Sequence, residues 1–397
     1  MKAIEDGTLA PSDELTLTRL GFLVSDPAVE RQEMLDAVAE ANRLGNEGRI
    51  TAVMNLDCNL ACSYCFEGNR KGKHYMSAET ADMLVDFAAE NYLRMDKNIR
   101  IDFYGGEPLL SLALIKDISQ KLKELSGKRG LDYTFTLVTN GTLLTRKVTE
   151  ELVALGLKSA KITLDGPREN HDVYRPFVSG KGSFDIILKN IKDVCDLIKV
   201  QTGGNYTKEN YREFPGLLDL FLAEGLTPDK LSLVMFAPIT KTLGEYKMPE
   251  FSEGCKSIDE PWLIEAGQYL REEILRRGFK TPKVSPSICM IENEDFLVVN
   301  HDGTIYKCPA FIGCEGLDVG DLETGIKDFH ESHNLDVWKK DECLDCAYLP
   351  LCFGGCRFLK LLQDGTIDDV ECRKAYLDAT LETFLLQDIK YTRKKNS

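Results

Sequence analysis

The sequence predicts an α/β protein whose main part is a partial (β/α)6 barrel, followed by a cysteine-rich C-terminal domain. Three observations predict this class. Six short apolar runs alternate with segments of helical periodicity between residues 49 and 255. Glycine-containing and polar motifs directly follow several of the runs, at the strand ends where barrel active sites are built. Eight of the 13 cysteines lie beyond residue 288, where the alternation has stopped.

Residues 1–48 precede the alternating pattern and form a separate predicted cap. The segment "PAVERQEMLDAVAEANRLG" within it predicts a helix that ends at Gly45. An ordinary packing extension and a peptide-recognition segment are the two interpretations of this cap.

The six apolar runs between residues 49 and 255 are short, mostly β-branched or aromatic, and bounded by Gly, Asn or Asp, which is typical of buried strands. Helices are expected between them, one of them capped by Ser77. Such alternation requires a parallel sheet with right-handed crossovers, either an open TIM-like barrel or a doubly wound sheet. The motifs at the strand ends favour the barrel. The predicted strands are Ile50–Leu56, Ile99–Tyr104, Tyr133–Val138, Ala160–Leu164, Ile198–Thr202 and Leu231–Phe236.

Two further parts follow the predicted barrel. Residues 256–285 contain "PWLIEAGQYLREEILRRG", which predicts a bridging helix, and residues 286–397 hold the C-terminal cysteines. The run "FLVVNHDGTIYKC" alternates like a β-hairpin, and its Asp302-Gly303 pair suits a tight turn that needs positive φ.

Composition excludes several classes of protein. A net charge of −15 argues against nucleic acid as the main partner, because phosphate binding needs a basic face. The sequence shows no leader-like segment and no apolar run of membrane-spanning length, so we expect a cytoplasmic protein without membrane contact. Thirteen cysteines in a reducing compartment indicate metal ligation rather than disulfides.

The first cysteine group is "CNLACSYC", in which Cys58, Cys62 and Cys65 have the spacing C-x3-C-x2-C. A structural zinc site needs four nitrogen or sulfur ligands, and this group is one short. A [4Fe–4S] cluster held by three thiolates keeps one iron open to a small molecule that binds through nitrogen and oxygen.

This group, with the aromatic Tyr64 in its last gap, resembles the signature of the radical SAM superfamily. The resemblance implies that the amino and carboxylate groups of S-adenosylmethionine chelate the open iron. It also implies reductive cleavage of that cofactor to a 5′-deoxyadenosyl radical, which abstracts hydrogen from a substrate.

Motifs at later strand ends also resemble this superfamily. "FYGGEP" resembles its methionine-binding motif, in which Gly105 and Gly106 allow close approach of the backbone and Glu107 offers a carboxylate to an ammonium. By the same resemblance, Asn140 in "TNGTLL" and Thr163 in "ITLDGP" contact the cofactor.

Arg175 in "ENHDVYRP" is a candidate clamp on the cofactor carboxylate, and a surface ion pair is the alternative.

The second cysteine group resembles the seven-cysteine SPASM extension of radical SAM enzymes, which implies two auxiliary [4Fe–4S] clusters and three clusters in all. A zinc ribbon is the alternative and would leave three of the seven thiols unexplained. The resemblance gives Cys343, Cys346, Cys352 and Cys372 to one cluster, and Cys289, Cys308 and Cys356 to the other, with Cys314 or a substrate cysteine as its possible fourth ligand.

Enzymes that this chain resembles over residues 50–380 mostly modify peptides or protein side chains. The sequence favours one that crosslinks a ribosomally made precursor peptide, with reduced flavodoxin or ferredoxin as electron donor. The alternative is an anaerobic sulfatase-maturing enzyme, but there an acidic residue follows the cysteine where this chain has Pro309. An electron-transfer iron–sulfur protein and a zinc-stapled binding module are alternatives from other classes.

Overall fold

The computed structural model describes residues 8–19, 23–24, 26–43, 45–65, 67–241, 254–255 and 257–393. It divides into two compact units, residues 1–45 and residues 46–397. The first unit contains helices α2 (Pro11–Arg19) and α3 (Pro27–Arg43). The helix predicted to end at Gly45 is therefore confirmed as α3, within one turn of its predicted end.

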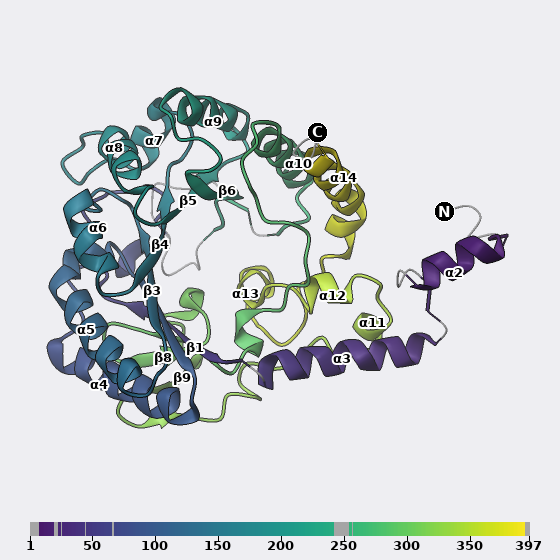
Figure 1. The fold of residues 1–397 in the computed structure, drawn as a ribbon, viewed down its shortest axis with the longest axis horizontal. Coiled ribbons are helices and arrows are strands. Elements are labelled where there is room, and N and C mark those ends of the chain that lie inside the picture. Colours follow the sequence, from purple (N-terminus) through teal and green to yellow (C-terminus); the bar gives the residue numbers. More distant parts are fainter. Residues whose placement is uncertain are drawn as a thin grey trace. The chain divides into compact units, whose positions relative to one another are not determined.

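All six predicted strands form in the second unit, and each pairs in parallel with the next along the chain. Their order in the sheet is the order of the sequence. A doubly wound sheet would reverse direction at a switch point, so the sequential order confirms the barrel arc (Figure 1). The strands are β1 (Glu47–Val53), β2 (Asn98–Tyr104), β3 (Tyr133–Thr139), β4 (Leu157–Thr163), β5 (Lys199–Tyr206) and β6 (Leu231–Pro238).

The crossover helices cover the outer face of this arc (Figure 1). The first begins at the predicted cap, where the Ser77 Oγ accepts a hydrogen bond from the Thr80 backbone N–H at 3.0 Å. The helices are α4 (Ala78–Asn91), α5 (Leu112–Lys128), α6 (Arg146–Val153), α7 (Arg168–Tyr174), α8 (Phe184–Val194) and α9 (Phe214–Ala223).

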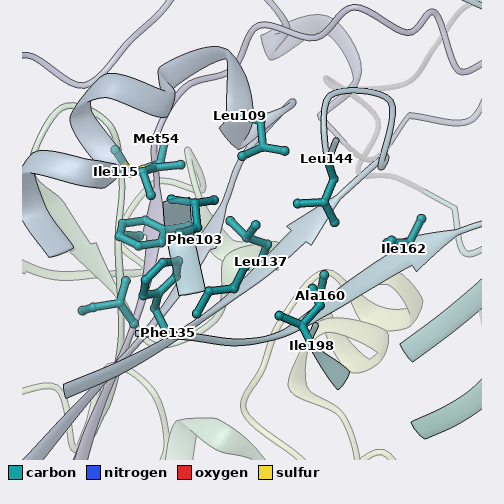
Figure 2. Packing of buried hydrophobic residues seen from close by; sticks show 14 of the residues in the cluster. Met54, Phe103, Leu109, Ile115, Phe135, Leu137, Leu144, Ala160, Ile162 and Ile198 are labelled. Atoms are coloured by element: carbon teal, nitrogen blue, oxygen red, sulfur yellow. The ribbon is translucent and has the colours of Figure 1, made fainter. Parts of the chain in front are cut away.

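The main core lies between the strands and these helices. Figure 2 shows Phe103, Phe135 and Leu137 packed together there, and the two phenylalanine rings meet edge to face with centroids 5.3 Å apart. Because strand side chains alternate between the two faces, the neighbours Tyr104 and Val138 point to the inner face. The inner face is therefore available for a site.

The predicted hairpin forms as β7 (Phe296–Val299) and β8 (Thr304–Tyr306), with Gly303 at φ +91° in its turn. The sequence did not reveal that β7 pairs in parallel with β1. Strands β9 (Asp318–Asp321) and β10 (Gly325–Ile326) extend the sheet to ten strands. The hairpin thereby covers a strand edge that would otherwise expose unpaired backbone groups.

The remaining helices lie in the C-terminal part of the chain. The predicted bridging helix is α10 (Pro261–Arg276), and its Arg271 binds Asp388 of α14 (Lys374–Arg393) at 2.7 Å. Among the described residues, none of the helices has the length and apolar character that a bilayer crossing requires. The others are α11 (Asp341–Leu344), α12 (Leu349–Cys352) and α13 (Arg357–Asp364).

Candidate active site

A cavity of about 280 Å³ lies at the carboxyl ends of the barrel strands. The strands direct different motifs to this one place, as expected for parallel strands in a barrel arc. Its lining includes Cys58, Cys62, Tyr64, Cys65, Lys71, Tyr104, Gly105, Gly106, Val138, Thr139, Asn140, Thr163, Arg175 and Asn205. This lining contains every residue that the superfamily resemblance predicts around the N-terminal cluster, except Glu107.

The loop that carries the three thiols is held by backbone hydrogen bonds. The Ala61 N–H donates to the Pro176 carbonyl at 2.8 Å, and the Ser63 N–H donates to the Tyr174 carbonyl at 3.1 Å. At the start of the loop, the Asp57 carboxylate accepts from the Cys58 N–H at 2.9 Å. The positions of the thiols are thus fixed by the chain that follows β4 as well as by their own spacing.

Burial raises the pKa of the Cys58 thiol and raises that of Cys62 to about 11, although Arg175 opposes the shift at Cys62. Both thiols are therefore protonated at neutral pH unless a cation stabilises the thiolate. A set of three sulfur donors that lines a cavity fits an iron–sulfur cluster, whose iron would supply that positive charge.

Gly105 and Gly106 line the cavity, but their lack of a side chain is required for packing against the exit of β1. A Cβ on Gly105, which has φ +131°, would lie 2.3 Å from the Asn55 carbonyl oxygen. A Cβ on Gly106 would lie 2.2 Å from the Asp57 carbonyl oxygen. The glycines therefore permit close approach to the cysteine loop, and their predicted contact with a cofactor stays a prediction.

Glu107 is fully buried and its carboxylate binds other parts of the protein. It accepts hydrogen bonds from the Asn140 N–H at 2.8 Å, from the Thr139 hydroxyl at 2.8 Å and from the Leu109 N–H at 3.0 Å. Burial raises its pKa, and these donors oppose the shift. Glu107 thus holds the end of β3 beside the cavity, and its predicted contact with an ammonium stays a prediction.

The Tyr64 hydroxyl links a buried polar network beside the thiols. It donates to the Asp165 carboxylate and accepts from Arg175 Nη1 at 2.8 Å and from Asn205 Nδ2 at 3.0 Å. Arg175 Nε is also buried and has no hydrogen-bond partner among the described residues. The alternative interpretation of Arg175 as a surface ion pair is wrong, because its side chain lies in the cavity wall.

Asn205 and Lys71 are among the cavity residues that the sequence analysis did not single out. Asn205 lies near the end of β5, but Gly203 and Gly204 had indicated that this strand ended earlier. Lys71 Nζ donates to the Leu60 carbonyl at 2.5 Å beside the cysteines. The rule that strand ends carry functional residues would have found Asn205 with the correct boundary, and no sequence signal pointed to Lys71.

His171 contacts the Asp165 backbone next to the polar network of Tyr64. Its Nδ1 accepts from the Asp165 N–H at 3.1 Å and its Nε2 contacts the Ser183 hydroxyl at 2.9 Å. Burial, together with the nearby positive charge of Arg175, lowers the pKa of His171 to about 2. The imidazole therefore stays neutral in the folded protein across the physiological range.

We expect acidification from pH 7 to pH 5 to lower the free energy of unfolding by about 2 kcal/mol through His171. In the unfolded chain this group has a pKa of 6.5, so the unfolded state takes up a proton that the folded state does not bind. The stabilisation is thus present above pH 6.5 and is lost below it. Denaturant unfolding at both pH values checks this, with His171→Asn as the comparison. Equal pH dependence in the two proteins would contradict it.

The C-terminal cysteines lie in two parts of the structure, and their assignment to two clusters stays a prediction. One cavity of about 310 Å³ is lined by Cys343, Cys346, Cys352 and Cys372. In the other set, Cys289, Cys308 and Cys356 pack against the same small hydrophobic cluster. Burial raises the pKa of Cys308 to about 12, and the neighbouring Cys289, Cys356 and Cys314 add to the shift.

Within the part of the chain that the structure describes, no three His, Cys, Asp or Glu side chains converge tightly enough to hold a single metal ion.

Comparisons with known proteins give a consistent result. A family profile described as "Radical SAM superfamily" matches residues 53–221. The uncharacterized protein MJ0907 of Methanocaldococcus jannaschii is 30% identical over 262 residues, which are 64% of this chain and 82% of that protein. A cysteine-type anaerobic sulfatase-maturating enzyme of Clostridium novyi is 24% identical over 382 residues, covering 84% of this chain and 96% of the enzyme.

A solved structure, Streptococcus suis SuiB bound to precursor peptide SuiA, has a similar fold. It superposes with a TM-score of 0.59 at 18% sequence identity, over 94% of this chain and 87% of SuiB. The similarity extends through the cysteine-rich C-terminal part.

Proposed function

Because the chain belongs to the radical SAM superfamily, we propose that it is a peptide-modifying enzyme that forms a thioether or other side-chain crosslink in a ribosomally made peptide. One observation carries the proposal. The three thiols of the loop after β1 open onto the same cavity as the glycine pair, Asn140 and Thr163. Catalytic components from several strand ends therefore meet at one place.

In this proposal Cys58, Cys62 and Cys65 hold a [4Fe–4S] cluster, and the cavity beside them holds S-adenosylmethionine. When bound, these two groups together supply a 5′-deoxyadenosyl radical for hydrogen abstraction. The donor set fits, because three sulfur ligands leave one coordination position for the cofactor.

Arg175 is the residue of this chain best suited to a carboxylate. Its Nη1 is oriented by Tyr64, and its Nε is buried with no partner among the described residues. A buried, unsatisfied guanidinium nitrogen is costly, and a carboxylate is the acceptor that matches its geometry best. The guanidinium donates to the Tyr64 hydroxyl, which donates in turn to Asp165, and this chain of hydrogen bonds keeps Arg175 in position before a ligand arrives.

We assign Cys343, Cys346, Cys352 and Cys372 to one auxiliary [4Fe–4S] cluster and Cys289, Cys308 and Cys356 to another, with Cys314 or a substrate thiol as the fourth ligand of the latter. In this assignment the second cluster stands close to the barrel sheet, since Cys308 follows β8 and β7 pairs with β1. An open iron there would suit the binding of a substrate cysteine before a carbon–sulfur bond forms.

The peptide substrate is supported by the names of the relatives. SuiB was solved with its precursor peptide, and the Clostridium novyi relative is a maturating enzyme whose substrate is a sulfatase. The match covers 94% of this chain for SuiB and 84% for the Clostridium novyi enzyme, which supports a related substrate class for this protein.

Sulfatase maturation, the oxidation of Cys or Ser to formylglycine, is the second candidate. It is favoured by the coverage of 96% of the Clostridium novyi enzyme. Against it stands Pro309, which begins the short 3-10 helix η7 (Pro309–Phe311) where an acidic residue is expected. A prolyl side chain offers no proton acceptor, so the expected base is absent from that position.

Co-expression with a small peptide encoded beside the gene tests the proposal. We expect reconstituted enzyme to release 5′-deoxyadenosine, and the peptide to lose two hydrogens, about 2 Da, for each crosslink. Fragmentation of the peptide would place the bond. An aldehyde at a Cys or Ser in place of a crosslink would favour sulfatase maturation, and cluster reduction without 5′-deoxyadenosine would indicate an electron-transfer protein.

A further inference from the structure

A second cavity, of about 500 Å³, lies beside β6, which is the last strand of the sheet. Helices α10 and α14 pack against each other and form other walls of it (Figure 1). We call it the edge cavity. It is larger than the candidate active-site cavity, and its lining includes the large apolar side chains Leu270, Ile274, Leu377 and Phe384.

The outer edge of β6 is covered at two points and open between them. The Val234 N–H donates to the Lys280 carbonyl at 2.8 Å, outside the sheet, and Thr240 forms an isolated bridge with Cys255. The Phe236 N–H points to the same side as that of Val234, because the backbone groups of a strand alternate between its two neighbours. It has no partner among the described residues. An unpaired backbone group at a sheet edge is a site where another extended chain can pair.

Two tyrosines in the lining of the edge cavity have unused hydroxyl groups. Tyr206 is only 4% exposed and Tyr376 is half-buried, and neither hydroxyl has a hydrogen-bond partner within the described parts of the chain. Burial raises the pKa of both hydroxyls, so each keeps the proton that it can donate. A buried hydroxyl without a partner is costly, which points to a ligand that supplies acceptors here.

Gly267 keeps space open beside Tyr376. It lies inside α10, where glycine is less favourable than alanine by about 1 kcal/mol. A Cβ at this position would lie 3.2 Å from the Tyr376 hydroxyl oxygen, which is closer than an ordinary contact. The glycine therefore leaves the hydroxyl in place at the cavity wall.

The edge cavity is continuous with the candidate active site. Pro238, at the carboxyl end of β6, lines both cavities. A chain that lies along the outer edge of β6 is thus led to the strand ends where the cysteine loop, Asn140 and Thr163 meet.

We propose that the edge cavity is a recognition subsite for the substrate peptide, which binds there as an extended segment along the outer edge of β6. This inference rests on the proposed function and assigns a place to the part of the peptide that does not react. A peptide main chain is the occupant that fits, because each of its residues offers a carbonyl acceptor to the Phe236 N–H and to the two tyrosine hydroxyls.

The walls of the cavity also indicate which side chain the peptide carries. Strand addition gives affinity through the main chain, and pockets for alternate side chains give specificity. The apolar walls between α10 and α14 suit a large aliphatic or aromatic side chain close in sequence to the residue that is modified.

The test measures binding of the fluorescein-labelled precursor peptide that is encoded beside the gene. The iron-loaded enzyme with S-adenosylmethionine is titrated without oxygen, and anisotropy gives Kd. We expect Y206F/Y376F to raise Kd about tenfold and to raise KM likewise, with kcat unchanged at saturating peptide. Gly267→Leu, whose side chain enters the cavity beside Tyr376, should weaken binding at least as much. Formation of 5′-deoxyadenosine without peptide should stay at the wild-type rate in both variants.

Y133F/Y391F is the matched control. It removes two hydroxyls that bind Ser119 and Glu272 and that line neither cavity, and we expect the wild-type Kd. Wild-type Kd in both Y206F/Y376F and Gly267→Leu would overturn the subsite. A changed oligomeric state in sedimentation with unchanged Kd would also overturn it, and would assign the cavity to a second copy of the chain. Wild-type enzyme that leaves the peptide unmodified would instead refute the proposed function.

Discussion

The variant C58A/C62A/C65A is expected to release no 5′-deoxyadenosine and to bind about four fewer irons per chain than the wild type. Three [4Fe–4S] clusters would hold about twelve irons, and these three substitutions remove every protein ligand of one of them. The cavity beside the loop keeps its other walls, so the fold should survive. Iron and sulfide analysis of oxygen-free protein, with product analysis by chromatography, checks both expectations.

Cys195→Ala is the matched control for this variant. Cys195 is half-buried directly after α8, where its thiol contacts the Lys192 carbonyl and faces none of the cysteine sets. We expect wild-type iron content and product formation. Cofactor cleavage retained in C58A/C62A/C65A would refute the assignment of the cluster, and loss of all twelve irons would show that the C-terminal clusters depend on the first.

Arg357→Met is expected to lower the free energy of unfolding by about 3–5 kcal/mol. Arg357 is fully buried next to Cys356, and its Nη2 donates to Glu292 at 2.6 Å. Glu292 has only 5% of its side chain exposed, and burial raises the pKa of its carboxyl. Loss of the guanidinium leaves a buried carboxylate without its cation, which costs more than the ion pair contributes.

Denaturant or thermal unfolding of oxygen-free protein measures this effect. The double variant R357M/E292M should be more stable than R357M alone, since no charge is left buried in it. Lys327→Met, which removes an exposed ion pair with Asp318, should change stability by less than about 1 kcal/mol. Equal destabilisation of the single and double variants would mean that packing, rather than the unpaired charge, accounts for the loss.

The six barrel strands were predictable because each is a short apolar run closed by a polar or glycine residue. The predicted ends of these strands were less reliable than their existence. Strand β5 extends to Tyr206, beyond the predicted end at Thr202, because Gly203 and Gly204 remain paired with β6. Glycine weakens a strand, but the strand continues through glycine where the adjacent strand still pairs with its backbone. This error concealed Asn205, which binds the Tyr64 hydroxyl.

The roles of Gly106, Glu107 and Arg175 show the limits of a motif. The sequence indicated that the first two belong to a site, but contacts with Asp57 and Asn140 explain much of their chemistry. For Arg175 the sequence left a surface ion pair as an equal alternative, and only burial distinguished the two.

The sequence by itself determined the barrel class and the hairpin around Gly303, because these depend on periodicity and local backbone preference. Only the tertiary structure decided that β7 completes the sheet at β1 and that Arg175 lies in the wall of the cavity that the thiols line. The reason is physical: each of these features joins residues that are more than 100 positions apart, and a local sequence pattern does not encode contacts at that separation.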